Sequence, residues 1–282
     1  MRNISARSCV LVGILVAATI AVSQADNLKD IEITDQFPID RCADSVGLVT
    51  SCLGADCNPY LPMTVGRIWV LDNFDCDDCE EFEKVQISML DETEIINGQM
   101  VRVMEEREWV GADPEELTLV EVSRNFLGMC PNTQDVFYFG EDECIDPEDE
   151  DAEDEPPFAG HFDCASIGLA YIPAGDGAWR AGLPGAAAGM LMQGGSFLLN
   201  ATYFQEQAED YGALDWAQNA ELGLAEAGFD DCVLVRDRNL LEDPKSKADG
   251  DEKVYCPGIG IVRDEDLEFE SCTDTGDVAC LQ

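Results

Sequence analysis

The stretch EIINGQMVRVM, residues 94–104, decides the fold class of this chain. Asn97 and Gly98 separate two runs that are rich in apolar side chains. An Asn-Gly pair in this setting favours a type I′ turn, because both central residues of that turn need a positive φ. We therefore predict a β-hairpin in which the two apolar runs pair as antiparallel strands.

Further strands are predicted on both sides of this hairpin. Residues 84–90 (KVQISML) alternate polar and apolar side chains, which is the period-two pattern of a half-buried strand. Residues 117–122 (LTLVEV) and 135–139 (DVFYF) are rich in β-branched and aromatic residues. With the hairpin, these segments predict an antiparallel meander, and residues 66–70 (GRIWV) predict a first core strand that leads into it.

The second half of the chain continues the pattern. Strands are predicted at residues 203–207, 232–236, 253–256, 259–263 and 267–269. Residues 216–227 fit a strand or a helix, because their Ala, Leu and Glu content favours a helix while their neighbours favour a sheet. The prediction is an all-β fold with room for a minor α-helix, built as one domain over residues 58–270. Its curved antiparallel sheet would form a half-barrel or a sandwich.

Four segments are predicted to lie outside the strands. Residues 26–57 and the tail at residues 271–282 contain cysteines and look irregular. Residues 141–157 (EDECIDPEDEDAEDEPP) hold too few apolar side chains to offset the entropy of ordering, which predicts a solvated, disordered loop. Residues 175–195 (GDGAWRAGLPGAAAGMLMQGG) predict a long compact loop at a pocket rim, with Trp179 turned inward.

Residues 1–25 have the composition of a cleavable signal peptide. Arg2 and Arg7 form a positive start, residues 10–22 are apolar, and the segment ends in the small residue Ala25. The apolar run is shorter than the roughly 20 residues that a membrane-spanning helix needs. The mature chain is therefore predicted to be secreted or periplasmic, with no membrane span.

The charge of the chain limits its partners. It has 59 acidic and 16 basic residues, which give a formal net charge of −43 at pH 7. Removal of residues 1–25 would take away Arg2 and Arg7 and no acid, so the mature chain would be more acidic still. A field of this sign disfavours nucleic acids and anionic membranes as partners and favours association with divalent cations.

Cysteines are frequent, with 13 in the whole chain, of which Cys9 lies in the predicted signal peptide. An even number remains for an oxidising compartment, which predicts disulfides whose connectivity the sequence does not specify. The short separations of Cys52 from Cys57 and of Cys272 from Cys280 make these two pairs plausible. The disulfide candidates are Cys42, Cys52, Cys57, Cys76, Cys79, Cys130, Cys144, Cys164, Cys232, Cys256, Cys272 and Cys280.

The segment NFDCDDCEEFE, residues 73–83, places Cys76 and Cys79 among acidic side chains. Acidic neighbours raise a thiol pKa, whereas a redox-active dithiol needs a stabilised thiolate. A zinc site would need a second Cys or His pair, and the chain has no second CxxC and a single histidine, His161. The favoured interpretation is a disulfide-closed hairpin tip. Calcium is the one cofactor suggested, through Asp75, Asp77, Asp78, Glu80 and Glu81.

Five short segments share features with known sequences: NPYLPMTVGRIWV, DVFYFGED, GAWRAGLPGAAAGMLM, YFQEQAED and VYCPGIGIV. In this order they resemble a group of uncharacterised secreted bacterial proteins. The corresponding patterns of the group are NPYxPLxxGxxW, VWYFGE, WxAGxxGAxPGxxM, YxQE and YAPGxGLV, in the same order. This chain departs from them by its extra cysteines, by the acidic residues 141–157 and by Cys256 in place of alanine. The resemblance implies a fold and a compartment and no activity.

Three functions are considered from the residues. The leading one is a secreted or periplasmic, non-enzymatic binding protein that holds a small apolar or lipidic ligand in the concavity of its sheet. The ligand-binding candidates are Trp179, Met190, Met192 and Tyr203. The alternatives are an acidic calcium-binding or surface-interaction protein without a cavity, and a carboxylate-based hydrolase with Glu206 and Glu209 as its pair. No catalytic residue is assigned, and whether the protein is an enzyme stays open.

Overall fold

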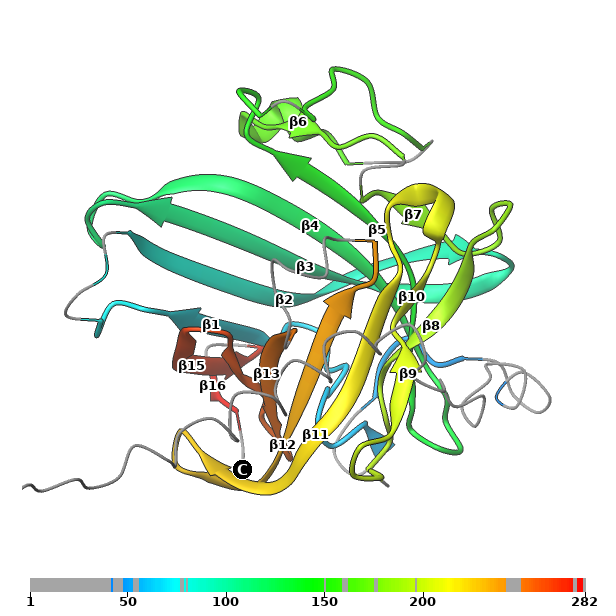
Figure 1. Ribbon diagram of the computed structural model, residues 1–282, viewed down its shortest axis with the longest axis vertical. Coiled ribbons are helices and arrows are strands. Elements are labelled where there is room, and N and C mark those ends of the chain that lie inside the picture. Colours follow the sequence, from blue (N-terminus) through cyan, green and yellow to red (C-terminus); the bar gives the residue numbers. More distant parts are fainter. Residues whose placement is uncertain are drawn as a thin grey trace, which may run out of the picture.

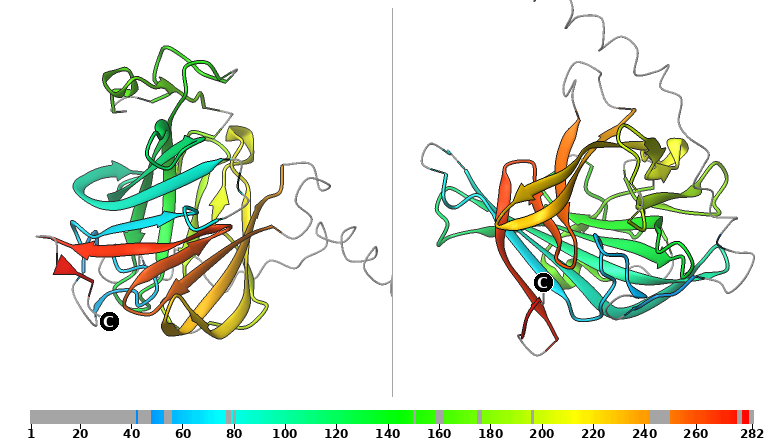
Figure 2. Two further views of the ribbon diagram at one scale, coloured as in Figure 1. Left: turned by 90° about the vertical axis from the view of Figure 1, so that its left-hand side faces the viewer. Right: turned by 90° about the horizontal axis from the view of Figure 1, so that it is seen from below.

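The computed structural model describes residues 42, 48–52, 56–76, 79, 81–149, 151–158, 162–174, 177–195, 197–241, 250–275 and 278–280 (Figure 1). Within these residues the chain forms one 16-stranded sheet, and its named strands pair antiparallel. Thirteen strands follow one another along a single path, and the sheet curves into a nearly closed barrel (Figure 2). The predicted all-β class and curved antiparallel sheet are confirmed.

The path begins and ends at short edge strands. In spatial order it runs through β10 (Glu206–Gln207), β8 (Ala187–Met192), β5 (Val136–Ile145), β4 (Thr118–Met129), β3 (Gln99–Gly111), β2 (Phe82–Ile96), β1 (Ile68–Asp72), β15 (Leu267–Asp274), β14 (Gly260–Asp264), β13 (Asp251–Cys256), β12 (Phe229–Asn239), β11 (Asp215–Glu226) and β9 (Thr202–Phe204). Off this path lie β6 (Ala170–Tyr171), β7 (Trp179–Arg180) and β16 (Val278–Ala279), together with the 3-10 helices η4 (Cys164–Ile167) and η5 (Glu209–Tyr211).

Two features bring the ends of the sheet together. β1 pairs with both β2 and β15, so the last long strand of the chain lies beside the first. At the other side, β9 pairs with β11 while β10 pairs with β8, and the single residue Gln205 joins β9 to β10. Because Gln205 lies between β9 and β10, it links the two edges of the barrel covalently. Its side chain is buried.

The predicted hairpin is present as β2 and β3. Asn97 and Gly98 form its turn with φ of 48° and 76°, as a type I′ turn requires. The meander continues through β4 and β5 in the predicted order. Residues 216–227, left open between strand and helix, form β11, which pairs with β9 and β12.

The prediction of a disordered loop at residues 141–157 is wrong at its start. β5 extends to Ile145, so the first acidic residues belong to a core strand. Asp142 is buried and forms an ion pair with Arg180, while Cys144 is held by a disulfide to Cys164. Farther on, Glu153 pairs with Tyr171 through backbone hydrogen bonds. Specific partners thus supply the free energy that apolar side chains do not.

The compact loop predicted at residues 175–195 instead contains β7 and β8, both of which pair with β5. The inward position of Trp179 is confirmed, since its side chain is fully buried. The small residues have a packing reason, because a Cβ at Gly189 would collide with the backbone of Gln205. A high Gly and Ala content here reflects close strand packing. The tail also begins later than predicted, since residues 271–274 belong to β15.

All twelve candidate cysteines form disulfides, so the predicted covalent framework is confirmed. The six pairs are Cys42–Cys130, Cys52–Cys57, Cys76–Cys79, Cys144–Cys164, Cys232–Cys256 and Cys272–Cys280. Both short-range pairs suggested by the sequence are among them. This number of disulfides indicates a protein that folds outside the cytoplasm. In the described part of the chain we find no helix with the length and apolar character needed to cross a membrane.

Candidate ligand-binding cavity

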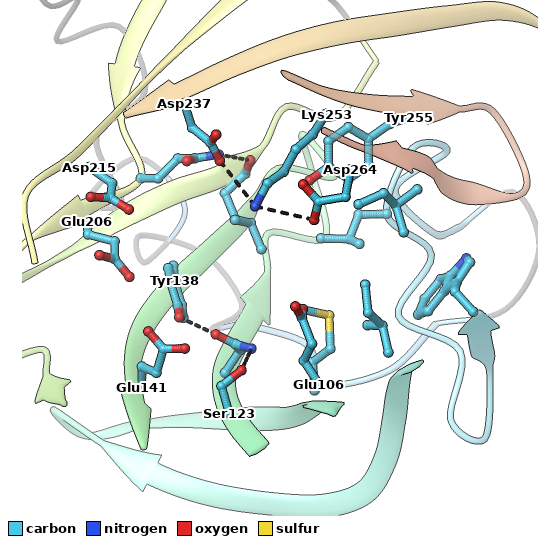
Figure 3. A pocket seen from close by; sticks show the side chains of 18 of the residues that line it. Glu106, Ser123, Tyr138, Glu141, Glu206, Asp215, Asp237, Lys253, Tyr255 and Asp264 are labelled. Atoms are coloured by element: carbon cyan, nitrogen blue, oxygen red, sulfur yellow. Dashed lines mark hydrogen bonds and ion pairs between the residues drawn. The ribbon is translucent and has the colours of Figure 1, made fainter. Parts of the chain in front are cut away.

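A cavity of about 220 Å³ lies inside the barrel, between strands from both halves of the chain (Figure 3). One part of its wall is apolar and is formed by Leu61, Trp69, Ile87, Met104, Leu191 and Ile261. The polar part is formed by Ser123, Asn125, Tyr138, Gln205, Tyr255, Lys253 and seven acids, namely Glu106, Glu121, Glu141, Glu206, Asp215, Asp237 and Asp264. Lys253 is the one basic residue among the described residues of this wall.

Strand alternation explains why acidic side chains meet inside the barrel. Successive residues of a strand point to opposite faces, so residues two apart share a face. On β3 the inward positions include Met104 and Glu106, and on β4 they include Glu121, Ser123 and Asn125. Inward positions that usually carry apolar residues therefore carry carboxyl groups here, and the meander becomes the acidic wall of the cavity.

Lys253 lies between two of the acids, as Figure 3 shows. Its Nζ atom is 3.5 Å from Oδ2 of Asp237 and 3.6 Å from Oδ2 of Asp264. These residues come from the neighbouring strands β13, β12 and β14. The two carboxylates raise the pKa of Lys253, whereas burial raises the pKa of Asp237 against the opposing effect of Lys253. The lysine is thus held charged and is already neutralised by its neighbours.

A second cluster of acids is formed by Glu206, Asp215 and Glu141. Glu206 is buried, accepts a 3.2 Å hydrogen bond from Nε1 of Trp179 and shares a hydrogen bond with Asp215. Burial is the main cause that raises the pKa of Glu206 well above its usual range, and the charges of Asp215 and Glu141 add to it. Glu206 therefore binds its proton more tightly than an exposed glutamate does.

Tyr138 connects this cluster to the wall formed by β4. Its hydroxyl donates to Oδ1 of Asn125, whose amide donates to Oγ of Ser123 over 3.3 Å. Glu141 also shares a hydrogen bond with Tyr138, and burial, followed by the charge of Glu143, raises the pKa of Glu141 well above its usual range. This continuous network fixes the orientation of the side chains around the acids.

Carboxyl groups continue along β2–β5 beyond the cavity. Glu108 lies directly opposite Glu121 across the β3–β4 pair, where two like charges disfavour each other. Burial, followed by neighbouring carboxylates, raises the pKa of Glu83 and of Glu143 to about 7 and also raises that of Glu121. Burial and mutual repulsion thus act together on several carboxyl groups of these strands.

The four predicted ligand-binding residues occupy the core and are absent from the cavity wall given above. Trp179, Met190, Met192 and Tyr203 are all buried. Trp179 reaches the site indirectly, through its hydrogen bond to Glu206. The hydroxyl of Tyr203 lies 3.5 Å from Oδ1 of Asn219, within hydrogen-bonding range.

The predicted calcium residues lie at the β1–β2 connection, and neither Asp75 nor Glu81 lines the cavity. Asp75 and Glu81 are exposed there, while Asp77, Asp78 and Glu80 fall outside the described residues. The Cys76–Cys79 disulfide closes this connection, as expected of a hairpin tip. Among the residues with described positions, no cluster of three or more potential ligands is arranged to hold a metal ion.

The sequence reasoning missed the cavity acids except Glu206. Glu206 was paired with Glu209 as a hydrolase candidate, but Glu209 is exposed on η5 while Glu206 is buried at the cavity. A signal was present in β3, where Glu106 lies two residues after Met104 and therefore shares its face of the strand. This signal could not single out Glu106, because the chain has 59 acidic residues and many of them lie on strands.

No protein-family model, curated protein or solved structure matches the chain. The resemblance to secreted bacterial proteins therefore stays a prediction. The cavity nevertheless gives its five segments a common location, because each contributes to the wall. Examples of these contributions, one from each segment in chain order, are Trp69, Glu141, Leu191, Glu206 and Tyr255.

Proposed function

We propose that the protein is an exported, non-enzymatic binding protein that holds a small organic cation inside its barrel. One observation carries this proposal: seven acidic residues and a single lysine line one interior cavity. The lysine is already paired with Asp237 and Asp264. Beyond Lys253, the described residues of the wall offer Glu141 and Glu206 no basic side chain.

Electrostatics favours an ammonium group as that partner. Burial disfavours carboxylates without a nearby cation, so such groups retain their protons and their pKa rises. An ammonium group would donate hydrogen bonds to several carboxylate oxygens at once, and charge-assisted hydrogen bonds are about twice as strong as neutral ones. The cluster of Glu206, Asp215 and Glu141 would receive it.

The size and the apolar part of the wall limit the rest of the ligand. Pockets for drug-sized molecules enclose roughly 300–1,000 Å³, and this cavity has about 220 Å³. A short hydrocarbon group would contact Trp69, Ile87 and Met104. The proposal therefore keeps the predicted binding function and replaces an apolar or lipidic ligand by a small amine.

The compartment is part of the proposal. The disulfides support export, and the composition of residues 1–25 supports a cleavable signal peptide that delivers the chain to the periplasm or the medium. Edman sequencing of the protein purified from an exporting host tests this, and we expect the first residue to be Asp26.

Calorimetry tests the binding function directly. We expect n-butylammonium to bind saturably at pH 7 and its uncharged analogue 1-butanol to give no saturable heat. Glu206→Gln should weaken butylammonium binding by about tenfold, which corresponds to ~1.4 kcal/mol. Glu209→Gln is the matched control, since Glu209 is exposed and only three positions away, and it should leave the affinity unchanged. Absence of butylammonium binding would contradict the proposal.

A carboxylate-based hydrolase is the second candidate, because the Glu206 and Asp215 carboxyl groups share a hydrogen bond. Two carboxyl groups that share a proton are the arrangement that aspartic proteases use for hydrolysis, whereas the carboxyl groups of glycosidases lie about 5–10 Å apart. Cleavage of a peptide substrate that disappears in Glu206→Gln would favour this candidate over simple binding.

Calcium association remains the third candidate, through the predicted residues 75–81. Calcium titration of the whole protein, compared with the variant Asp75→Asn/Glu81→Gln, tests it. Saturable binding that the variant loses would support a calcium site at this connection.

A further inference from the structure

The inward carboxyl groups of β3, β4 and β5 are arranged in rows that cross the strands. In one row, Asn125 of β4 lies beside Glu141 of β5. In the next row, Ser123 of β4 lies between Glu106 of β3 and Glu143 of β5. The second row therefore places a carboxyl group on each side of a serine, next to the acids already proposed to hold the cation.

The distance between the two rows is set by the strand repeat. Glu141 and Glu143 are two residues apart on β5, so their side chains point to the same face of the sheet. A strand rises about 3.4 Å per residue, which separates the rows by about 7 Å. The two nitrogens at the ends of an extended four-carbon chain are roughly 6 Å apart, from the lengths of its five bonds. A ligand with ammonium groups at both ends of such a chain would thus meet both rows.

The second row carries negative charge that a second ammonium group would neutralise. Burial, followed by the charge of Glu108, raises the pKa of Glu143 to about 7. Burial, followed by the charge of Asp264, likewise raises the pKa of Glu106 to about 7, against the opposing effect of Lys253. The ammonium group of Lys253 is itself held by its two carboxylate neighbours on β12 and β14. A cation between Glu106 and Glu143 would offset the repulsion that acts on both carboxyl groups.

The surroundings of the second row suit a short hydrocarbon chain that ends in a charge. Ser123 has a small side chain, which leaves space between the two longer acids beside it. Ile87 lies opposite Glu106 on the neighbouring strand β2, and Met104 lies two residues before Glu106 on β3. Both apolar side chains line the cavity. Methylene groups that pass from one row to the other would contact them and leave water.

We infer that the ligand is a linear aliphatic diamine whose two ammonium groups bind successive rows of carboxyl groups. One ammonium group binds at Glu206 and Glu141, and the other binds between Glu106 and Glu143. This inference rests on the proposed function, since it names the class of cation that the same cavity holds. The four-carbon spacing follows from the strand repeat and distinguishes this site from a surface that attracts cations in general.

Calorimetry with ligands of one length tests the second ammonium group. The probes are 1,4-diaminobutane, 4-aminobutan-1-ol and n-butylammonium, titrated into the whole protein at pH 7 in about 0.15 M salt, which screens exposed charges. We expect the diamine to bind at least tenfold more tightly than 4-aminobutan-1-ol, in which a hydroxyl replaces the second ammonium group. A smaller advantage would overturn the inference, and the proposed function would stand if the monoamines bind. Failure of all three probes to bind would overturn the proposed function itself.

Variants of the second row locate the second ammonium group. Glu106→Gln and Glu143→Gln should each reduce the advantage of the diamine over 4-aminobutan-1-ol at least threefold. Glu270→Gln is the control, because it removes an exposed carboxylate from β15 and should leave this advantage unchanged. A smaller reduction in either folded variant, or an equal reduction in the control, would show that the overall negative charge attracts the second ammonium group. That result would overturn the inference, and the remaining variant decides if one of the two does not fold.

Discussion

Glu106 lies at an inward position of β3, where burial, followed by the charge of Asp264, raises its pKa from 4.5 to about 7. The folded protein therefore binds more protons than the unfolded chain between these two values, and the contribution of Glu106 to stability falls as the pH rises through this window. The unfolding free energy of the wild type should fall between pH 4.5 and pH 7. We expect it to fall less in Glu106→Gln.

Urea unfolding at pH 4.5, 6 and 8 measures this effect. The control is Glu209→Gln, which alters an exposed glutamate and should reproduce the pH dependence of the wild type. Parallel pH profiles for all three proteins would contradict the assignment of a raised pKa to Glu106.

Trp179 links the core to the cavity, because it is fully buried, packs edge-on against Tyr138 at 5.5 Å and donates to Glu206. Trp179→Ala should lower the unfolding free energy by about 3–5 kcal/mol, as large cavities in cores do. Trp179→Phe retains a ring and loses the donor, so it should cost less stability, about 1–2 kcal/mol, while still weakening ligand binding through Glu206. A stability loss below about 1 kcal/mol for the alanine variant would show that the ring is not a core element.

At the scale of elements, strands were predicted correctly where one face of the strand is apolar or where the residues of a turn specify its type. The turn Asn97-Gly98 is an example of the second case. Strand prediction failed for the end of β5, because the acids there line the cavity or pair with Arg180. It also failed for β8, because glycine is required there by the approach of another backbone. In both places long-range contacts decided the structure, and no local pattern encodes them.

Disulfides of different span should stabilise the sheet to different degrees. Cys42–Cys130 joins residues 88 apart in sequence, whereas Cys52–Cys57 joins residues 5 apart. In the chain-entropy description, loss of the first should cost about 4–5 kcal/mol and loss of the second about 2 kcal/mol. Denaturant unfolding of the paired Cys→Ser variants measures both costs, and an equal or reversed order would contradict the covalent closure of the long loop.

At the scale of the whole molecule, the site depends on convergence that the sequence does not display. The cavity acids belong to seven strands of the barrel, from Glu106 on β3 to Asp264 on β14. An acid on a strand usually faces solvent, so its inward direction becomes clear only when the barrel closes through β15 and Gln205. Composition predicted that the molecule attracts cations. It could not predict that the strongest cluster lies inside.

The central claim is that mutual repulsion and burial keep protons on the interior carboxyl groups until an organic cation replaces them. Calorimetric titration of n-butylammonium at pH 7, in buffers that differ in ionisation enthalpy, counts the protons exchanged on binding. We predict a net release of protons, because the ammonium group lowers the raised pKa values of Glu106, Glu141 and Glu206. Binding heats that are the same in every buffer, or a net uptake of protons, would contradict this claim.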